Sequence, residues 1–112
     1  MIDVRSTLSA RPLGDRELFL TRAFAAPRAR VYAAHVDPAL LTRWLSTERA
    51  TLTECVFEAR PGGPIRYVWR HRGGGTITLR GTVEEVVPNE RIVHVEVFDD
   101  DWTGGPVRVT TT

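Results

Sequence analysis

After Glu48, apolar and polar side chains alternate at every second position almost to the end of the chain. Alternation with period two is typical of strands that bury one face. Turn-forming stretches interrupt the pattern, among them ARPGGP (residues 59–64), the glycines at 73–75 and Pro88-Asn89. Strands that are joined by such short turns pair antiparallel. We therefore expect a meander of at least five strands, over residues 51–59, 65–72, 76–87 and 91–98 and from residue 107 onward.

Two short helices are expected ahead of this meander. The first begins at Pro27 and runs to about Val36, and the second is DPALLTRWL, residues 37–45. Asp37 suits the N-cap of the second helix, and the proline after it suits the first turn. Apolar side chains recur four positions apart in this helix, as Leu40 with Trp44 and Leu41 with Leu45. This face should pack against the sheet. Trp44 then serves either as a core anchor or as a wall of a binding site.

A further strand is predicted before the helices. Glu17 to Phe24 (ELFLTRAF) has β-type composition, and Arg22 is the polar exception on its apolar side. Residues 1–15 carry serine, proline, glycine and scattered charges, which predicts a loose lead-in to one domain over residues 16–112. The order β, α, α and then antiparallel strands is an α+β plan and not a succession of βαβ units.

Composition excludes several classes of function. The net charge of +1 lacks the strongly basic character of nucleic-acid-binding proteins. All 15 basic residues are arginine, so no lysine can form a Schiff base with a substrate or cofactor. Cys55 is the only cysteine, which excludes an internal disulfide and favours a buried thiol. The N-terminus is not a secretory signal and no apolar run could span a membrane, so we expect a cytoplasmic protein.

The run TRAFAAPRARVYAAHVDPALLTRWL (residues 21–45) resembles the SRPBCC superfamily, which has the START-like or helix-grip fold. Within it, the chain looks most like the branch named after the C-terminal domain of the activator of the heat-shock chaperone ATPase. Further matching segments are EARPGGPIRYVW (58–69), GTVEEVVPNERIVHVEVFDDDW (81–102) and GGPVRVTTT (104–112). The resemblance implies a curved antiparallel sheet that grips a long C-terminal helix, with a hydrophobic cavity between them.

Members of this family continue past the segment that matches VRVTTT, so the resemblance implies a domain that is truncated before the long C-terminal helix. In the family the first strand pairs with the last, and Glu17 to Phe24 would therefore lack its partner. Unpaired strand edges and uncovered apolar faces favour association. We expect a second copy to complete the sheet as a homodimer.

Apolar pockets with a few convergent polar groups are how small-molecule sites are usually built. The chain offers such a set of candidate ligand-binding residues: Arg22, Trp44, Phe57, Tyr67, Trp69, His94, Glu96 and Trp102. His94 and Glu96 share one side of their strand and could act as an acid–base pair. The alternative is that Val93, Val95 and Val97 form the core side while His94 and Glu96 face water. No local metal motif is present, and no metal or cofactor is expected.

Three functions remain open at this level. The first is a domain that binds a small hydrophobic or amphipathic molecule, with Arg22 or His94 orienting the polar end. The second is an enzyme of the cyclase or hydrolase kind that uses the same cavity, with proton transfer by His94 and Glu96. The third, which the name of the branch suggests, is a protein-interaction module that stimulates a chaperone ATPase in the stress response.

Overall fold

The computed structural model describes residues 8–99 and 104–112. These residues form β1 (Ser9–Leu13), β2 (Glu17–Thr21), α1 (Arg28–Val36), α2 (Pro38–Leu45), β3 (Ala50–Phe57), β4 (Pro64–His71), β5 (Thr76–Val87), β6 (Arg91–Phe98) and β7 (Val107–Thr111). The predicted α+β plan is confirmed, with two short helices ahead of an antiparallel meander. The bounds of the main-sheet strands differ from the predicted ones by at most two residues.

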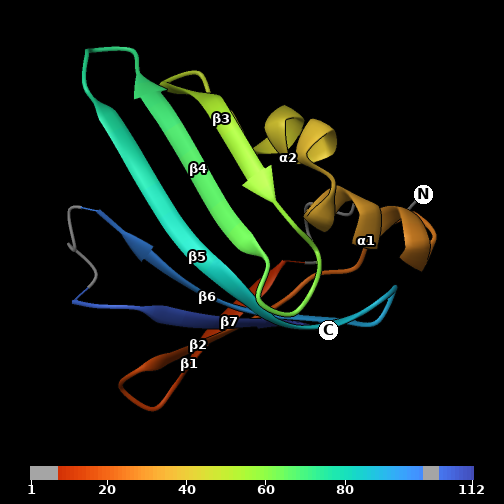
Figure 1. Ribbon diagram of the computed structural model, residues 1–112. Coiled ribbons are helices and arrows are strands. Elements are labelled where there is room, and N and C mark those ends of the chain that lie inside the picture. The colour runs from red at the N-terminus through yellow and green to blue at the C-terminus, as the bar shows by residue number, and fades with distance from the viewer. Residues whose placement is uncertain (1–7, 100–103) are drawn as a thin grey trace.

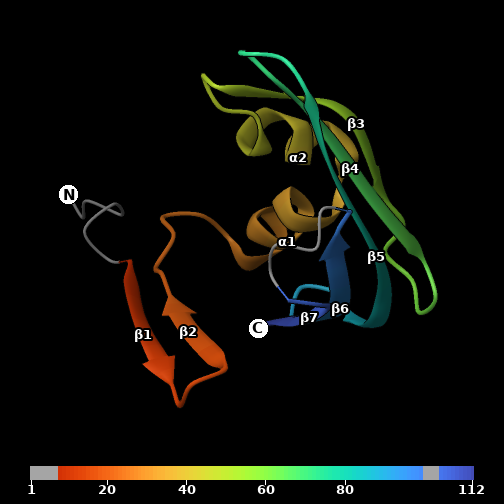
Figure 2. The ribbon, with the colours of Figure 1, turned by 90° about the vertical axis from the view of Figure 1, so that its left-hand side faces the viewer.

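The main sheet has five strands in the order β3-β4-β5-β6-β7, so each strand pairs with its neighbours in sequence. The sheet curves, and both helices lie on its inner, concave side (Figures 1 and 2). The β3–β4 register shifts between Leu52 and Glu54, and the β5–β6 register shifts between Val83 and Glu85. Irregularities of this kind bend a strand and increase its local twist. They help to give the sheet the curvature that encloses the helices.

The core lies between the inner face of the sheet and the helices. Ile65 on β4 and Val83 on β5 are its most deeply buried side chains. The other buried members of this cluster are Leu41, Leu52, Phe57, Tyr67, Leu79 and Ile92. On β4 the buried side chains alternate with exposed ones, as Ile65 and Tyr67 do, which confirms the period-two pattern expected of a strand that buries one face.

Helix α2 begins at a well-formed cap. The Oδ1 atom of Asp37 accepts a hydrogen bond of 2.9 Å from the backbone N–H of Ala39, and Pro38 occupies the first turn. Leu41 and Leu45 face the sheet, with Leu41 buried in the core. The expectation that Trp44 anchors this core is wrong, because 51% of its surface is exposed. Trp44 lies on the neighbouring stripe of the helix, where it packs against α1.

Strands β1 and β2 form a separate two-stranded sheet that stands away from the main sheet (Figure 2). The stretch predicted as a loose lead-in over residues 1–15 thus contains a strand, and the strand predicted over residues 17–24 ends at Thr21. Pro12 lacks a backbone N–H, which weakens the strand signal of β1. Gly14 adopts a positive φ of 70° in the turn, a conformation that glycine adopts without strain and that lets the chain reverse.

The cap of α2 supplies the first testable prediction. Asp37→Ala removes the side-chain acceptor of this cap and should lower the free energy of unfolding by about 1 kcal/mol. Asp37→Asn, the matched control, keeps an acceptor oxygen and should cost less. Urea unfolding monitored by circular dichroism measures both. Equal losses in the two variants would show that the cap hydrogen bond does not stabilise the helix.

Candidate ligand-binding site

The pairing of β5 with β6 decides which side of β6 faces the helices. His94 lies directly opposite Val83, which is fully buried, and Glu96 lies opposite Gly81. Directly paired residues in antiparallel strands share a face. His94 and Glu96 therefore point to the inner side, and the alternative in which both face water is wrong. Their side chains are 14% and 22% exposed, respectively.

His94 and Glu96 form a polar pair on this otherwise apolar surface. The Nδ1 atom of His94 lies 3.4 Å from the Oε2 atom of Glu96, which is beyond the usual hydrogen-bond length. Among the described residues, His94 Nδ1 is buried without a hydrogen-bond partner. The imidazole ring meets the ring of Phe57 edge to face, at 6.1 Å between centroids. A buried polar atom without a partner costs free energy, so this nitrogen is a place where a bound group could be stabilised.

Aromatic side chains line the same face beside the polar pair. The rings of Tyr67 and Trp69 meet edge to face at 5.7 Å, and Trp69 lies 6.5 Å from Phe98. The indole Nε1 of Trp69 donates a hydrogen bond of 3.0 Å to the backbone carbonyl of Leu45, which ties the sheet to the end of α2. The cluster of Phe57, Tyr67, Trp69, His94, Glu96 and Phe98 is called the inner-face cluster below.

The environment of Tyr67 and Cys55 changes the pKa of both side chains. Burial raises the pKa of the Tyr67 phenol above its ordinary value, and the nearby Cys55 and Glu96 raise it further. Burial also raises the pKa of the Cys55 thiol, against the opposing effect of a hydrogen bond with the side chain of Thr42. Both groups are therefore protonated at neutral pH. Cys55 lacks the lowered pKa that a nucleophilic cysteine requires.

The structure does not bring every predicted ligand residue to this cluster. Arg22 lies in the linker after β2, where it is exposed and its guanidinium stacks over Phe24 at 5.5 Å. Trp44 packs against α1, where its Nε1 donates to the carbonyl of Ala34 and its ring lies 5.6 Å from that of His35. The prediction for Trp102 falls outside the described residues. Phe57, Tyr67, Trp69, His94 and Glu96 do gather on one face.

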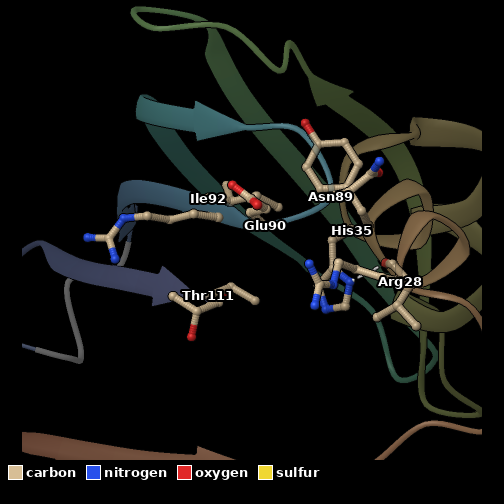
Figure 3. A pocket seen from close by; sticks show the side chains of 10 residues that line it. Arg28, His35, Asn89, Glu90, Ile92 and Thr111 are labelled. Carbon is tan, nitrogen blue, oxygen red and sulfur yellow. Dashed lines mark hydrogen bonds between the residues drawn. The ribbon is translucent and has the colours of Figure 1, made fainter.

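A pocket in the described part of the chain lies elsewhere, between α1, the β5–β6 turn and the end of β7 (Figure 3). Its volume is about 90 Å³, well below the ~300 Å³ at the lower end of small-molecule sites. It is lined by Arg28, Val31, Tyr32, His35, Asn89, Glu90, Arg91, Ile92, Thr111 and Thr112. None of the predicted ligand-binding residues is among them.

His35 has a defined orientation in this pocket. Its Nδ1 lies 2.7 Å from the carbonyl oxygen of Val31, which can only accept, so Nδ1 carries the proton and donates. Within residues 8–99 and 104–112, no three side chains of the kinds that ligate metals come together in a group that could hold an ion. No helix in the described part of the chain is long and apolar enough to cross a membrane.

The raised pKa values of Tyr67 and Cys55 predict how stability changes with pH. The folded chain keeps both protons to higher pH than the unfolded chain does, so their contribution is complete below the ordinary values of 9.0 and 10.0. The free energy of unfolding should then fall as the pH rises through about 9 to 11. Urea unfolding at successive pH values measures this fall.

Two variants show how much Tyr67 and Cys55 each contribute to this loss of stability at high pH. Tyr67→Phe should remove most of the loss above pH 10, whereas Cys55→Ala should reduce only the part that begins near pH 9. If Tyr67→Phe lost stability above pH 10 as steeply as the unmodified chain, the phenol would not be the group responsible.

The comparison with protein families gives one match. The family model described as Activator of Hsp90 ATPase homolog 1-like protein matches residues 25–112, which include both helices and all five strands of the main sheet. No curated protein matches the chain.

Crystal structures of bacterial proteins are also similar. A Rhodobacter sphaeroides protein is 39% identical with a TM-score of 0.86, and the match covers 93% of this chain and 67% of that one. A Chromobacterium violaceum protein is 33% identical with a TM-score of 0.71, and the match covers 81% of this chain and 63% of that one. A Nitrosomonas europaea protein is 26% identical with a TM-score of 0.62, over 66% of this chain and 48% of that one.

This chain thus spans between about half and two thirds of the length of these relatives. The family match covers most of the chain, and the fold is the one expected from the resemblance. The chain belongs to the Activator of Hsp90 ATPase homolog 1-like family of the SRPBCC superfamily, with its helix-grip-like α+β fold.

Proposed function

We propose that the inner face of the sheet binds a small amphipathic molecule. The observation that carries this proposal is His94 Nδ1, a buried polar atom without a partner in the described chain, set beside Glu96 among aromatic rings. Polar groups in a core are normally satisfied by the protein itself. A ligand group placed beside the pair would satisfy His94 and would account for a histidine and a glutamate on an apolar surface.

The chemistry of the pair narrows the class of ligand. An ionised Glu96 accepts hydrogen bonds and repels another anion, so the polar end of the ligand should be a neutral group that donates and accepts, such as a hydroxyl. The apolar end would lie on the rings of Trp69 and Phe98. Burial of apolar surface contributes about 25 cal/mol per Å² before the cost of ordering is subtracted. The ligand class is therefore a medium-chain alcohol or a molecule with similar polarity.

A matched pair of probes tests this assignment. The full chain should bind octan-1-ol more tightly than octanoate at neutral pH, because the two have chains of the same length but only octanoate carries a charge. Trp69 lies within the proposed site, so tryptophan fluorescence should report the titration. Stronger binding of octanoate, or no saturable binding of either probe, would contradict the proposal.

Two variants test whether the polar pair causes the preference for octan-1-ol over octanoate. Glu96→Gln removes the negative charge and keeps the shape, so octanoate binding should approach that of octan-1-ol. Glu54→Gln is the control, because Glu54 lies on β3 and pairs with the exposed Arg66 at 3.1 Å. The control should leave the preference unchanged. Thermal unfolding in the absence of probe shows whether each variant keeps the fold.

Proton transfer is a second candidate function, favoured by the separation of 3.4 Å between His94 and Glu96. A cyclase or hydrolase that used this pair would lose turnover, and not only affinity, in His94→Ala. The description of the family also suggests contact with a chaperone ATPase. That activity would raise the ATPase rate of a chaperone and would survive His94→Ala. Each of these functions is compatible with the cytoplasmic location that the sequence suggests.

A further inference from the structure

One row of side chains on the outer side of the main sheet centres on Arg70 of β4. Thr51 of β3 and Thr76 of β5 lie directly opposite Arg70, one on each side. Residues that pair directly in antiparallel strands share a face, and successive residues of a strand point to opposite faces. Because Trp69 belongs to the inner-face cluster, its neighbour Arg70 points outward together with the two threonines. All three of these outward side chains are exposed.

Two further arginines make up the next row on the outer side. The backbone N–H of Arg72 donates a hydrogen bond of 2.7 Å to the carbonyl of Arg49, one step beyond the pair of Ala50 and His71. Arg72 follows Arg70 along the chain with one residue between them, so it points to the same side. Arg49 and Arg72 are both exposed. The arginine cluster, at the top of the sheet in Figure 1, consists of Arg49, Thr51, Arg70, Arg72 and Thr76.

The arginine cluster differs from the rest of the sheet in the balance of its charges. Every other arginine in the strands of the main sheet forms an ion pair: Arg66 with Glu54, Arg80 with Asp99, Arg91 with Glu85 and Arg108 with Glu84. Within residues 8–99 and 104–112, no ion pair involves Arg49, Arg70 or Arg72. Cations that lie side by side repel one another, so a bound anion would stabilise this part of the sheet.

Backbone hydrogen bonds hold the arginines of the cluster in position. The Oγ1 atom of Thr47 accepts from the backbone N–H of Arg49 at 3.2 Å. At the end of β4, the N–H of His71 donates to the carbonyl of Gly75 at 3.0 Å, which closes the turn that carries Arg72. Binding therefore needs to order only the side chains, and this lowers its cost in entropy.

We infer that the arginine cluster binds one phosphoryl group, carried by a phosphorylated side chain of another protein. A guanidinium group donates two parallel hydrogen bonds to a phosphate, and a threonine hydroxyl donates one more. A phosphorylated serine or threonine carries a charge of about −2 and three acceptor oxygens. Three cations and two hydroxyls match this demand, and clusters of arginine are one of the recurring ways in which proteins recognise phosphorylated segments.

The openness of the arginine cluster favours a protein over other sources of phosphate. Small-molecule sites enclose most of their ligand, whereas every residue of this cluster is exposed. A phosphorylated side chain inserts only its phosphoryl group, so an open face suffices. Clusters that bind anionic lipids usually have about four to eight basic residues. Nucleic-acid binding calls for a strongly basic domain, and the net charge here is only +1.

Two short peptides test the inference, one with phosphothreonine and the other with threonine between the same glycines. NMR spectra of the arginine Nε–Hε groups of the full chain follow each titration. The phosphorylated peptide should shift the signals of Arg49, Arg70 and Arg72 saturably, and the threonine peptide should not. Phenyl phosphate should bind no more tightly than the phosphorylated peptide, because the open face gives a small ester no enclosing wall.

A matched pair of variants assigns the binding to the cluster. Arg70→Gln should weaken binding of the phosphorylated peptide by about tenfold, as expected for the loss of hydrogen bonds to a charged group. Arg66→Gln is the control, because Arg66 lies on the same side of β4 and already pairs with Glu54. It should change the affinity by less than about twofold. Thermal unfolding shows whether each variant keeps the fold.

Several results would overturn the inference. These are equal shifts with both peptides, no saturable shift with the phosphorylated one, or an equal loss of affinity in the two variants. Much tighter binding of phenyl phosphate would assign the cluster to a free phosphate ester. Co-sedimentation with vesicles that contain phosphatidylinositol 4-phosphate, without binding of the peptide, would assign it to a membrane. The cluster lies on the outer side of the sheet, so none of these results depends on ligand binding at the inner face.

Discussion

The structure depends on the burial of one face of a curved sheet beneath two short helices. Leu41 of α2 and the deeply buried Ile65 and Val83 hold this contact together, and the hydrogen bond from Trp69 to Leu45 fixes where α2 ends on the sheet. The helices are too short to cover all five strands. Coverage is greatest over β3 and β4 and falls toward β7, where Val107 is exposed. The polar pair on β6 lies between these regions, which is why it is only partly buried.

The sequence predicted the central strands, both helices and the cap at Asp37, because these depend on local periodicity and on turn chemistry. It left open which side of the strand His94 and Glu96 face, because both sides carry apolar residues, Ile92 on the side of His94 and Val93 on the other. Only the pairing of His94 with Val83 decides it. The burial of Trp44 was mispredicted for a related reason, because two apolar stripes adjoin on α2 and the sequence does not show which one faces the sheet. Strand β1 was missed because Pro12 interrupts its pattern.

A histidine and a glutamate on an apolar face are costly to the fold, and this cost is the reason for assigning them a function. Apolar side chains at both positions would avoid the desolvation of two polar groups. In the described chain, Glu96 lies too far from His94 Nδ1 to satisfy it with a good hydrogen bond. A ligand hydroxyl beside the pair would supply that partner, and the low local dielectric would strengthen the interaction.

The central claim is that the inner face, and not the pocket beside α1, receives the ligand. Two-dimensional ¹H–¹⁵N NMR of the full chain during titration with octan-1-ol tests it most directly. We expect saturable shifts of the amides of Tyr67, Trp69, His94 and Glu96. Shifts confined to His35, Asn89 and Glu90 of the pocket beside α1, or no saturable shifts at all, would contradict the claim.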